Sequence, residues 1–179
     1  MIIVNLQISS WVPLRSSITS QNCIYLESFQ VGLKKSNFEE IRLPQSLKIL
    51  ALSVSNLKDD TMRQLGKLED LNVLRLLAHS YIGDEMICER KNFPKLQVLK
   101  IWVLMELKGW TIEEGAMPVL RELEIRYCPN LKKIEGLKNL SKLKELKLTN
   151  MAKVKGIISE DIIKEQNLET HPPWTSSYS

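Results

Sequence analysis

A pattern of alternating apolar and polar residues occurs twice in the middle of the chain. FPKLQVLKI at residues 93–101 is followed, at one repeat's distance, by MPVLRELEI at residues 117–125. Both segments carry proline at the second position and apolar residues at the fourth, seventh and ninth. Side chains of an extended segment alternate between two faces, so Leu99 and Ile101 lie on one side and Lys100 on the other. The pattern predicts a short strand with one buried face in each copy.

The same spacing, apolar-x-x-apolar-x-apolar, can be followed through seven segments whose starts are almost evenly separated. The first two segments are weaker, because apolar triplets are common and Phe29 and Val31 replace leucine in the second. The interval lies in the range of about 20–29 residues that is typical of leucine-rich repeats, whose units must stack to bury their apolar faces. The segments begin at Ile3, Leu26, Leu47, Leu71, Leu96, Leu120 and Leu143.

The pattern predicts an α/β fold, a leucine-rich-repeat solenoid. A curved parallel sheet should form the concave side, and short helices and loops should cover the convex side. Residues 59–68 begin with two aspartates, which suit a helix N-terminus, and apolar residues follow at helical spacing. Residues 83–88 and 111–115 are expected to form short helical turns or loops.

The periodicity divides the chain into four parts. Residues 1–42 hold the weaker repeats and residues 43–151 the regular ones. Residues 152–166 could form a capping helix, and residues 167–179 are expected to be a disordered tail. A solenoid needs a terminal unit with a polar outer face, whereas this chain starts at once with the apolar segment 2–4. We therefore expect the array to be truncated at this end, as a fragment or the product of a truncated gene.

Composition argues against several classes of protein. The 179 residues carry a net charge of only +4, and no apolar run reaches the roughly 18 residues of a membrane helix. Cys23, Cys88 and Cys128 are scattered singly and the chain has two histidines, so neither a disulfide framework nor a metal site is expected. The start also lacks the basic segment of a signal peptide, and a cytoplasmic location follows as an expectation.

Five segments of the chain carry a resemblance to a known family. They are LKDDTM (57–62), SYIGDEMIC (80–88), FPKLQVLKI (93–101), GWTIEEGAMPVLRELEI (109–125) and CPNLKKI (128–134). In these segments the chain resembles the C-terminal repeats of plant coiled-coil, nucleotide-binding, leucine-rich-repeat (CC-NB-LRR) disease resistance proteins. The resemblance implies a repeat array that keeps the receptor inactive and contributes to pathogen recognition. The phosphate-binding motif G-x-x-x-x-G-K-[ST] of the family's upstream nucleotide-binding domain does not occur here, so no nucleotide or other cofactor is expected.

The concave face is the default binding surface of a solenoid. Its mixture of charged and aromatic residues suits protein recognition better than catalysis, and Trp102 and Tyr127 are the best candidates for energetically dominant contacts. Lys100–Glu122 and Arg126–Glu145 could instead be cross-strand pairs that keep the sheet soluble. The predicted protein-binding residues are Arg75, Lys100, Trp102, Glu122, Glu124, Arg126, Tyr127, Glu145 and Lys147.

Other candidate chemistry is weaker. Residues 132–155 hold eight lysines, but these are interleaved with repeat leucines and lack arginine, which favours a solvated face over a nucleic-acid site. Glu113 and Glu114 could be an acid–base pair, but no His, Ser or Cys nearby completes a catalytic set. Cys88 and Cys128 are expected to be buried structural thiols rather than redox-active groups.

We therefore expect a non-enzymatic protein-binding module. Its expected partners are its own or a related nucleotide-binding domain, a pathogen effector or a guarded host protein, with no nucleic acid and no membrane span. One alternative is a repeat scaffold such as an F-box substrate receptor, although no F-box-like helical segment occurs. The other alternative is a non-functional truncated remnant.

Overall fold

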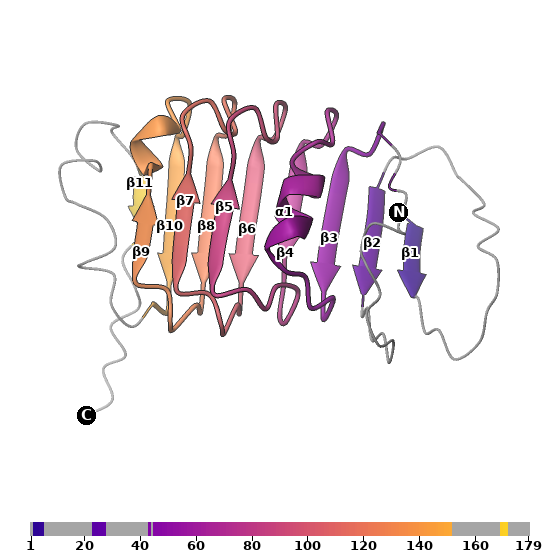
Figure 1. Cartoon of the computed structure of the whole chain (residues 1–179), viewed down its shortest axis with the longest axis horizontal. Coiled ribbons are helices and arrows are strands. Elements are labelled where there is room, and N and C mark those ends of the chain that lie inside the picture. The colour runs from indigo at the N-terminus through magenta and orange to yellow at the C-terminus, as the bar shows by residue number, and fades with distance from the viewer. Residues whose placement is uncertain (1, 6–22, 28–42, 44, 152–168, 172–179) are drawn as a thin grey trace.

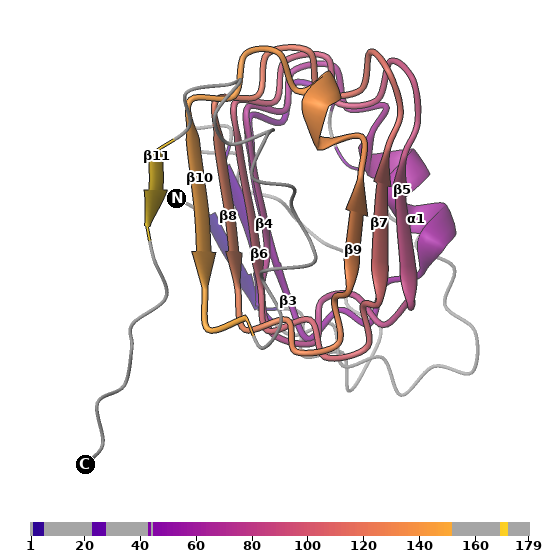
Figure 2. The same ribbon diagram turned by 90° about the vertical axis from the view of Figure 1, so that its left-hand side faces the viewer.

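The computed structural model of the chain describes residues 2–5, 23–27, 43, 45–151 and 169–171. Successive coils add one strand each to a large parallel sheet (Figure 1), which has eight strands in the order β1-β2-β3-β4-β6-β8-β10-β11. A small parallel sheet, β5-β7-β9, faces it across the core (Figure 2). The predicted leucine-rich-repeat solenoid is confirmed.

The large sheet consists of β1 (Ile2–Asn5), β2 (Cys23–Glu27), β3 (Ile49–Ser53), β4 (Val73–Leu76), β6 (Val98–Trp102), β8 (Glu122–Arg126), β10 (Glu145–Thr149) and β11 (Glu169–His171). The small sheet consists of β5 (Glu85–Cys88), β7 (Gly109–Ile112) and β9 (Lys133–Glu135). The helical elements described are α1 (Asp59–Leu65) and a short 3₁₀ turn, η2 (Leu137–Asn139).

The five regular repeats have the predicted register. Two rows of apolar residues cross β3, β4, β6, β8 and β10, and the residues of each row are direct Cα partners. All of these side chains are buried in the core between the two sheets. Equal coil lengths therefore bring the leucines of one repeat onto those of the next, as the period predicts. The rows are Leu50, Leu74, Leu99, Leu123 and Leu146, and Leu52, Leu76, Ile101, Ile125 and Leu148.

The register predicted for the first two segments is wrong. In β2, Ile24 and Leu26 are the partners of Leu50 and Leu52 in β3, so the strand positions precede the predicted Phe29 and Val31. Strand β1 is displaced in the same direction from its predicted positions, Leu6 and Ile8. Residues 24–31 contain two apolar pairs with a spacing of two, and only pairing with the neighbouring strand selects between them.

A second sheet forms on the side opposite the large sheet. Its strands β5 and β7 lie in segments for which helical turns or loops were predicted. Residues 83–88 contain β5, and β7 includes the start of residues 111–115. Met86 and Cys88 in β5 are buried, and Ile87 between them is half-buried. This period-two alternation is that of a strand. Parallel pairing between coils then satisfies the backbone N–H and C=O groups of both segments.

The end of the chain also differs from the prediction. Residues 169–171, expected to lie in a disordered tail at 167–179, form β11 beside β10, with Glu169 opposite Glu145. The outer edge of β10 offers unpaired backbone groups, and an added strand satisfies them. The capping helix predicted at residues 152–166 lies outside the described residues.

Candidate functional site

The solvent side of the large sheet, called here the outer face, carries its side chains in three rows that cross the strands. The parallel register defines the rows, because residues at equivalent positions are Cα partners. Eight of the nine predicted binding residues lie in them. The first row is Ile49, Val73, Val98, Glu122 and Glu145; the second is Ala51, Arg75, Lys100, Glu124 and Lys147; the third is Trp102, Arg126 and Thr149.

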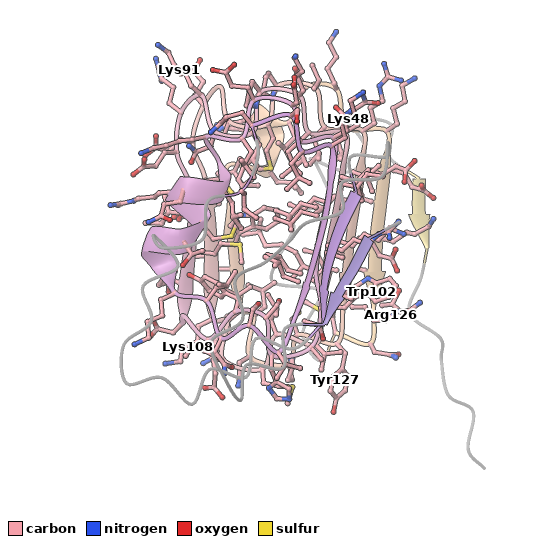
Figure 3. The ribbon with its side chains drawn as sticks, turned by 90° about the vertical axis from the view of Figure 1, so that its right-hand side faces the viewer. Lys48, Lys91, Trp102, Lys108, Arg126 and Tyr127 are labelled. Carbon is pink, nitrogen blue, oxygen red and sulfur yellow. The ribbon has the colours of Figure 1, made fainter. Side chains whose placement is uncertain are left out.

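The ninth predicted residue, Tyr127, lies beyond the rows. It directly follows β8 and has a φ of 52°, so the chain turns sharply there. Figure 3 shows Trp102 and Arg126 on the outer face and Tyr127 at the edge of the sheet where β8 ends. The Tyr127 side chain is 47% exposed. It is available to a partner that reaches around this edge.

Glu124 joins two cations around the Trp102 ring. Its Oε2 lies 3.1 Å from Lys100 Nζ and its Oε1 lies 3.7 Å from Arg126 Nη2. Lys100 Nζ and Arg126 Cζ lie 5.7 and 5.1 Å from the centre of the Trp102 ring. These distances fall within the range of cation–π attraction. The result is a compact aromatic and charged cluster on β6 and β8.

The ion pairs predicted from the sequence are wrong. Lys100 lies directly opposite Glu124, whereas Glu122 lies opposite Val98. Glu145 pairs with Lys147 of its own strand at 2.6 Å and not with Arg126. The hydrogen bond from Lys147 to Glu145 raises the pKa of Lys147.

The outer face carries a shallow depression among the residues that the structure describes. This depression between β6, β8 and β10, lined by residues that include Lys100, Glu122 and Glu145, has room for about one water molecule. No group of three or more His, Cys, Asp or Glu side chains in the described part of the chain could hold a metal ion. A surface of this kind suits contact with a macromolecule better than enclosure of a small ligand.

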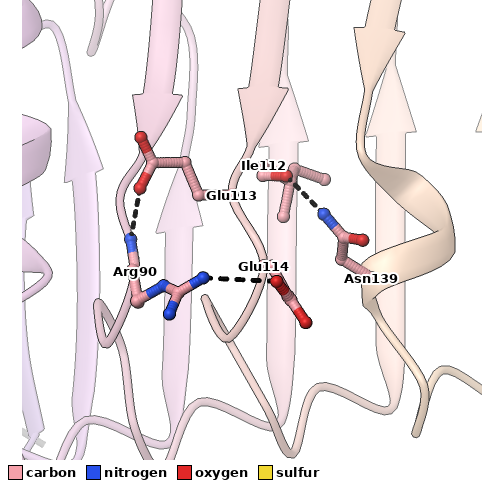
Figure 4. Close-up of polar contacts among 5 residues, drawn as sticks. All are labelled: Arg90, Ile112, Glu113, Glu114 and Asn139. Atoms are coloured by element: carbon pink, nitrogen blue, oxygen red, sulfur yellow. Dashed lines mark hydrogen bonds and ion pairs between the residues drawn. The ribbon is translucent and has the colours of Figure 1, made fainter.

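The Glu113–Glu114 pair links neighbouring coils. The backbone N–H of Arg90 donates a hydrogen bond of 2.8 Å to Glu113 Oε2, and Arg90 Nη2 lies 3.2 Å from Glu114 Oε2 (Figure 4). The interpretation of these residues as a surface loop rather than an acid–base pair agrees with these contacts.

The lysines of residues 132–151, the described part of the lysine-rich segment, lie on different sides of the solenoid. Lys147 lies on the outer face of the large sheet, Lys133 lies in the small sheet, and Lys138 lies in η2. Lysines of the last coil are thus distributed around the solenoid.

Cys88 and Cys128 are buried and unpaired. Cys88 Sγ accepts a hydrogen bond of 3.4 Å from Trp110 Nε1. Burial raises the pKa of Cys88 to about 12 and that of Cys128 to about 11. The expectation of structural thiols agrees with this environment, since only the thiolate is strongly nucleophilic.

These thiols are therefore expected to react slowly. In a Cys23→Ser variant, a disulfide reagent at pH 8 should modify the native chain on the order of 100-fold more slowly than the guanidinium-unfolded chain. Raising the pH from 8 to about 9 should accelerate the unfolded chain only about threefold, because its thiols are already partly ionised near the ordinary thiol pKa. Reaction through the native thiolates should rise about tenfold over the same interval, because the pKa values of the buried thiols lie well above it. Equal rates in the native and unfolded states would contradict this burial.

Within the described parts of the chain, no helix combines the length and apolar character that a membrane span requires.

Comparisons with known proteins agree with this architecture. The family described as "Leucine-rich repeat region" matches residues 6–171. Disease resistance RPP8-like protein 3 of Arabidopsis thaliana is 34% identical over 149 residues, which are 81% of this chain and 16% of that protein. Disease resistance protein RPP8 of the same plant is 36% identical over 130 residues, 72% of this chain and 14% of the relative.

Disease susceptibility protein LOV1, also from Arabidopsis thaliana, is 31% identical over 150 residues, 82% of this chain and 16% of the relative. The matched region is thus about one sixth of the length of these relatives. The resemblance that the sequence motifs indicated is confirmed. The chain belongs to the leucine-rich repeat region family, and its repeats are related to those of plant disease resistance proteins.

Proposed function

We propose that the chain is the protein-binding leucine-rich-repeat module of a plant intracellular immune receptor. Its outer face contacts the nucleotide-binding domain of its own or a related receptor and so helps to keep that receptor inactive. Recognition of a pathogen effector, or of a host protein that the receptor guards, uses the same face. The module acts in the defence response by binding and carries out no catalytic step.

The cluster around Trp102 is the main support for this proposal. Tryptophan, tyrosine and arginine dominate the binding energy of protein interfaces. Trp102 and Arg126 lie side by side here, and Tyr127 is the next residue along the chain where β8 ends. The two strands beneath them, β6 and β8, each pair with a neighbouring strand on both sides. This pairing makes the sheet rigid at the cluster. Such a preformed surface loses little entropy when a partner binds.

The cytoplasm is the proposed compartment. Cys88 and Cys128 are free thiols, and unpaired cysteines are typical of reducing compartments. A cytoplasmic nucleotide-binding domain would then be accessible to this module.

Trp102→Ala is expected to weaken binding to the nucleotide-binding region of an RPP8-like relative by about tenfold or more. The substitution removes the aromatic ring over which the Lys100 and Arg126 cations lie. Biolayer interferometry with the immobilised chain would measure the dissociation constant. Circular dichroism would verify that the variant remains folded.

Ile87→Ala is the matched control. Ile87 lies half-buried on the small sheet, away from the outer face, so its removal should leave binding within about twofold of the parent chain. A folded Trp102→Ala variant that bound as tightly as the parent would exclude the outer face as the contact surface.

A further inference from the structure

Charge on the outer face is separated along the strand direction. The first row, at the amino ends of the strands, holds Glu122 and Glu145 beside aliphatic residues and has no cation on β3 to β10. The second and third rows hold four cations and one carboxylate. They are Arg75, Lys100, Arg126 and Lys147, against Glu124. The carboxyl-terminal half of the face is therefore cationic.

The two arginines are the cations most available to a partner. Lys100 is held by Glu124 at 3.1 Å, and Lys147 is held by Glu145 at 2.6 Å. Arg126 has a long contact of 3.7 Å with Glu124 and a side chain that is 48% exposed. Arg75 is exposed and takes part in none of the ion pairs among the described residues. Guanidinium groups bind carboxylates through two parallel hydrogen bonds.

The Trp102 indole lies beside Arg126 and has an unused donor. Its Nε1 is shielded from solvent and has no acceptor within the described structure. The flexible Lys100 and Arg126 side chains lie near the ring. A partner carboxylate that engaged Arg126 would move this side chain and place an acceptor near the indole N–H.

The separation of the arginines sets a spacing for the partner. Arg75 in β4 and Arg126 in β8 are two strands apart across the sheet and one row apart along it. Strand spacings of about 4.8 Å and a rise of about 3.3 Å per residue place their Cα atoms roughly 12 Å apart. An extended peptide covers this distance in three to four residues.

We propose that the outer face binds an acidic segment of its protein partner, in which two carboxylates three to four residues apart pair with Arg75 and Arg126. The inference rests on the proposed function and adds the chemistry of the partner to it. The segment crosses the strands near their carboxyl ends. Glu124 is compatible with this path, because its side chain is 12% exposed and stays paired with Lys100 at 3.1 Å.

The test uses the ¹⁵N-labelled chain at low salt, where exposed charges are least screened. The probe is the peptide Gly-Ser-Glu-Gly-Gly-Glu-Ser-Gly with blocked ends, and the control peptide has glutamine in place of both glutamates. We expect the acidic peptide to shift the indole N–H resonance of Trp102, assigned with Trp102→Phe. The resonance of Trp110 should stay in place, because that indole is buried and donates to Cys88 Sγ.

Arg75→Gln and Arg126→Gln should each weaken the apparent affinity about threefold or more. Lys133→Gln, which removes a cation from the small sheet, should leave it unchanged. The proposal is overturned if the Trp102 resonance does not move at about 10 mM acidic peptide. It is equally overturned if the glutamine peptide shifts that resonance as much, or if both arginine variants respond like the parent.

The two proposals can fail separately. A nucleotide-binding region whose binding is lost in Trp102→Ala but unchanged in both arginine variants would leave the outer face as the contact surface and exclude an acidic partner segment. A shift of Trp102 by the acidic peptide, together with unchanged partner binding in Trp102→Ala, would support the carboxylate site and exclude that domain as its occupant.

Discussion

Leu123→Ala should lower the free energy of unfolding by about 2–5 kcal/mol, as large-to-small substitutions in a core do. Leu123 lies at the second position of β8 and is 1% exposed. Its Cα partners are Leu99 and Leu146 in the flanking strands. The substitution leaves a cavity that neighbouring coils cannot fill, since each is fixed by parallel pairing on both sides. Urea unfolding followed by circular dichroism would measure the loss.

Glu122→Gln is the matched control for this substitution. Glu122 precedes Leu123, is exposed and takes part in none of the ion pairs among the described residues, so the change in stability should stay within about 0.5 kcal/mol. Glu124 would be a poorer control, because its side chain is only 12% exposed and its carboxylate joins Lys100 and Arg126. If Leu123→Ala and Glu122→Gln unfolded alike, the register assigned to β8 would be wrong.

The regular part of the fold could be predicted because the coil length is nearly constant. Leu99 and Leu123 are Cα partners, and the same offset in sequence joins Lys100 to Glu124 on the solvent side of the same strands. A period of two within each strand and a constant period between coils together determine which residues share a row. In the first two segments the apolar triplets are ambiguous, and the same reasoning selected the wrong pairs.

The small sheet could not be predicted with the same certainty. Its strands have three or four residues, and an apolar stretch this short is compatible with a turn, a helix or a strand. The pairing of Met86 with Trp110 is what makes these segments strands. That contact is between coils, so no local pattern reports it.

Which residues lie on the outer face could be predicted, but their pairing could not. Alternation within the strands is sufficient to place Arg75, Trp102 and Lys147 on the outer face. Glu122, the partner predicted for Lys100, precedes the observed partner Glu124 in β8. The sequence separation between Lys100 and Glu124 equals the offset that relates every paired position of β6 and β8. The position of Arg126 beside Trp102 depends on the same offset and on side-chain rotamers.

The contact between η2 and strand β7 of the preceding coil depends on a glycine. Gly136 has a φ of +77°, and a Cβ atom there would lie 1.9 Å from the carbonyl oxygen of Ile112. The same oxygen accepts a hydrogen bond of 2.9 Å from Asn139 Nδ2, which links η2 to β7 (Figure 4). Backbone occupies the space in question, so a side chain cannot be accommodated by rotating a neighbour. Gly115 has a similar φ of +81°, but its Cβ would meet only Arg90 Cγ at 3.7 Å.

Gly136→Ala should therefore cost about 2–5 kcal/mol of unfolding free energy, of which about 1–2 kcal/mol is left-handed backbone strain and the rest is overpacking. Gly115→Ala has the strain without the clash and should cost about 1–2 kcal/mol. Comparing the unfolding free energies of both variants in urea would isolate the cost of the steric clash, because the backbone conformation is nearly the same at the two sites. Equal losses would mean that coil spacing at the end of β7 can expand, and that the Asn139 link does not hold Ile112 in place. A larger loss for Gly136→Ala would show that close backbone contact between neighbouring coils at the end of β7 leaves no room for a side chain.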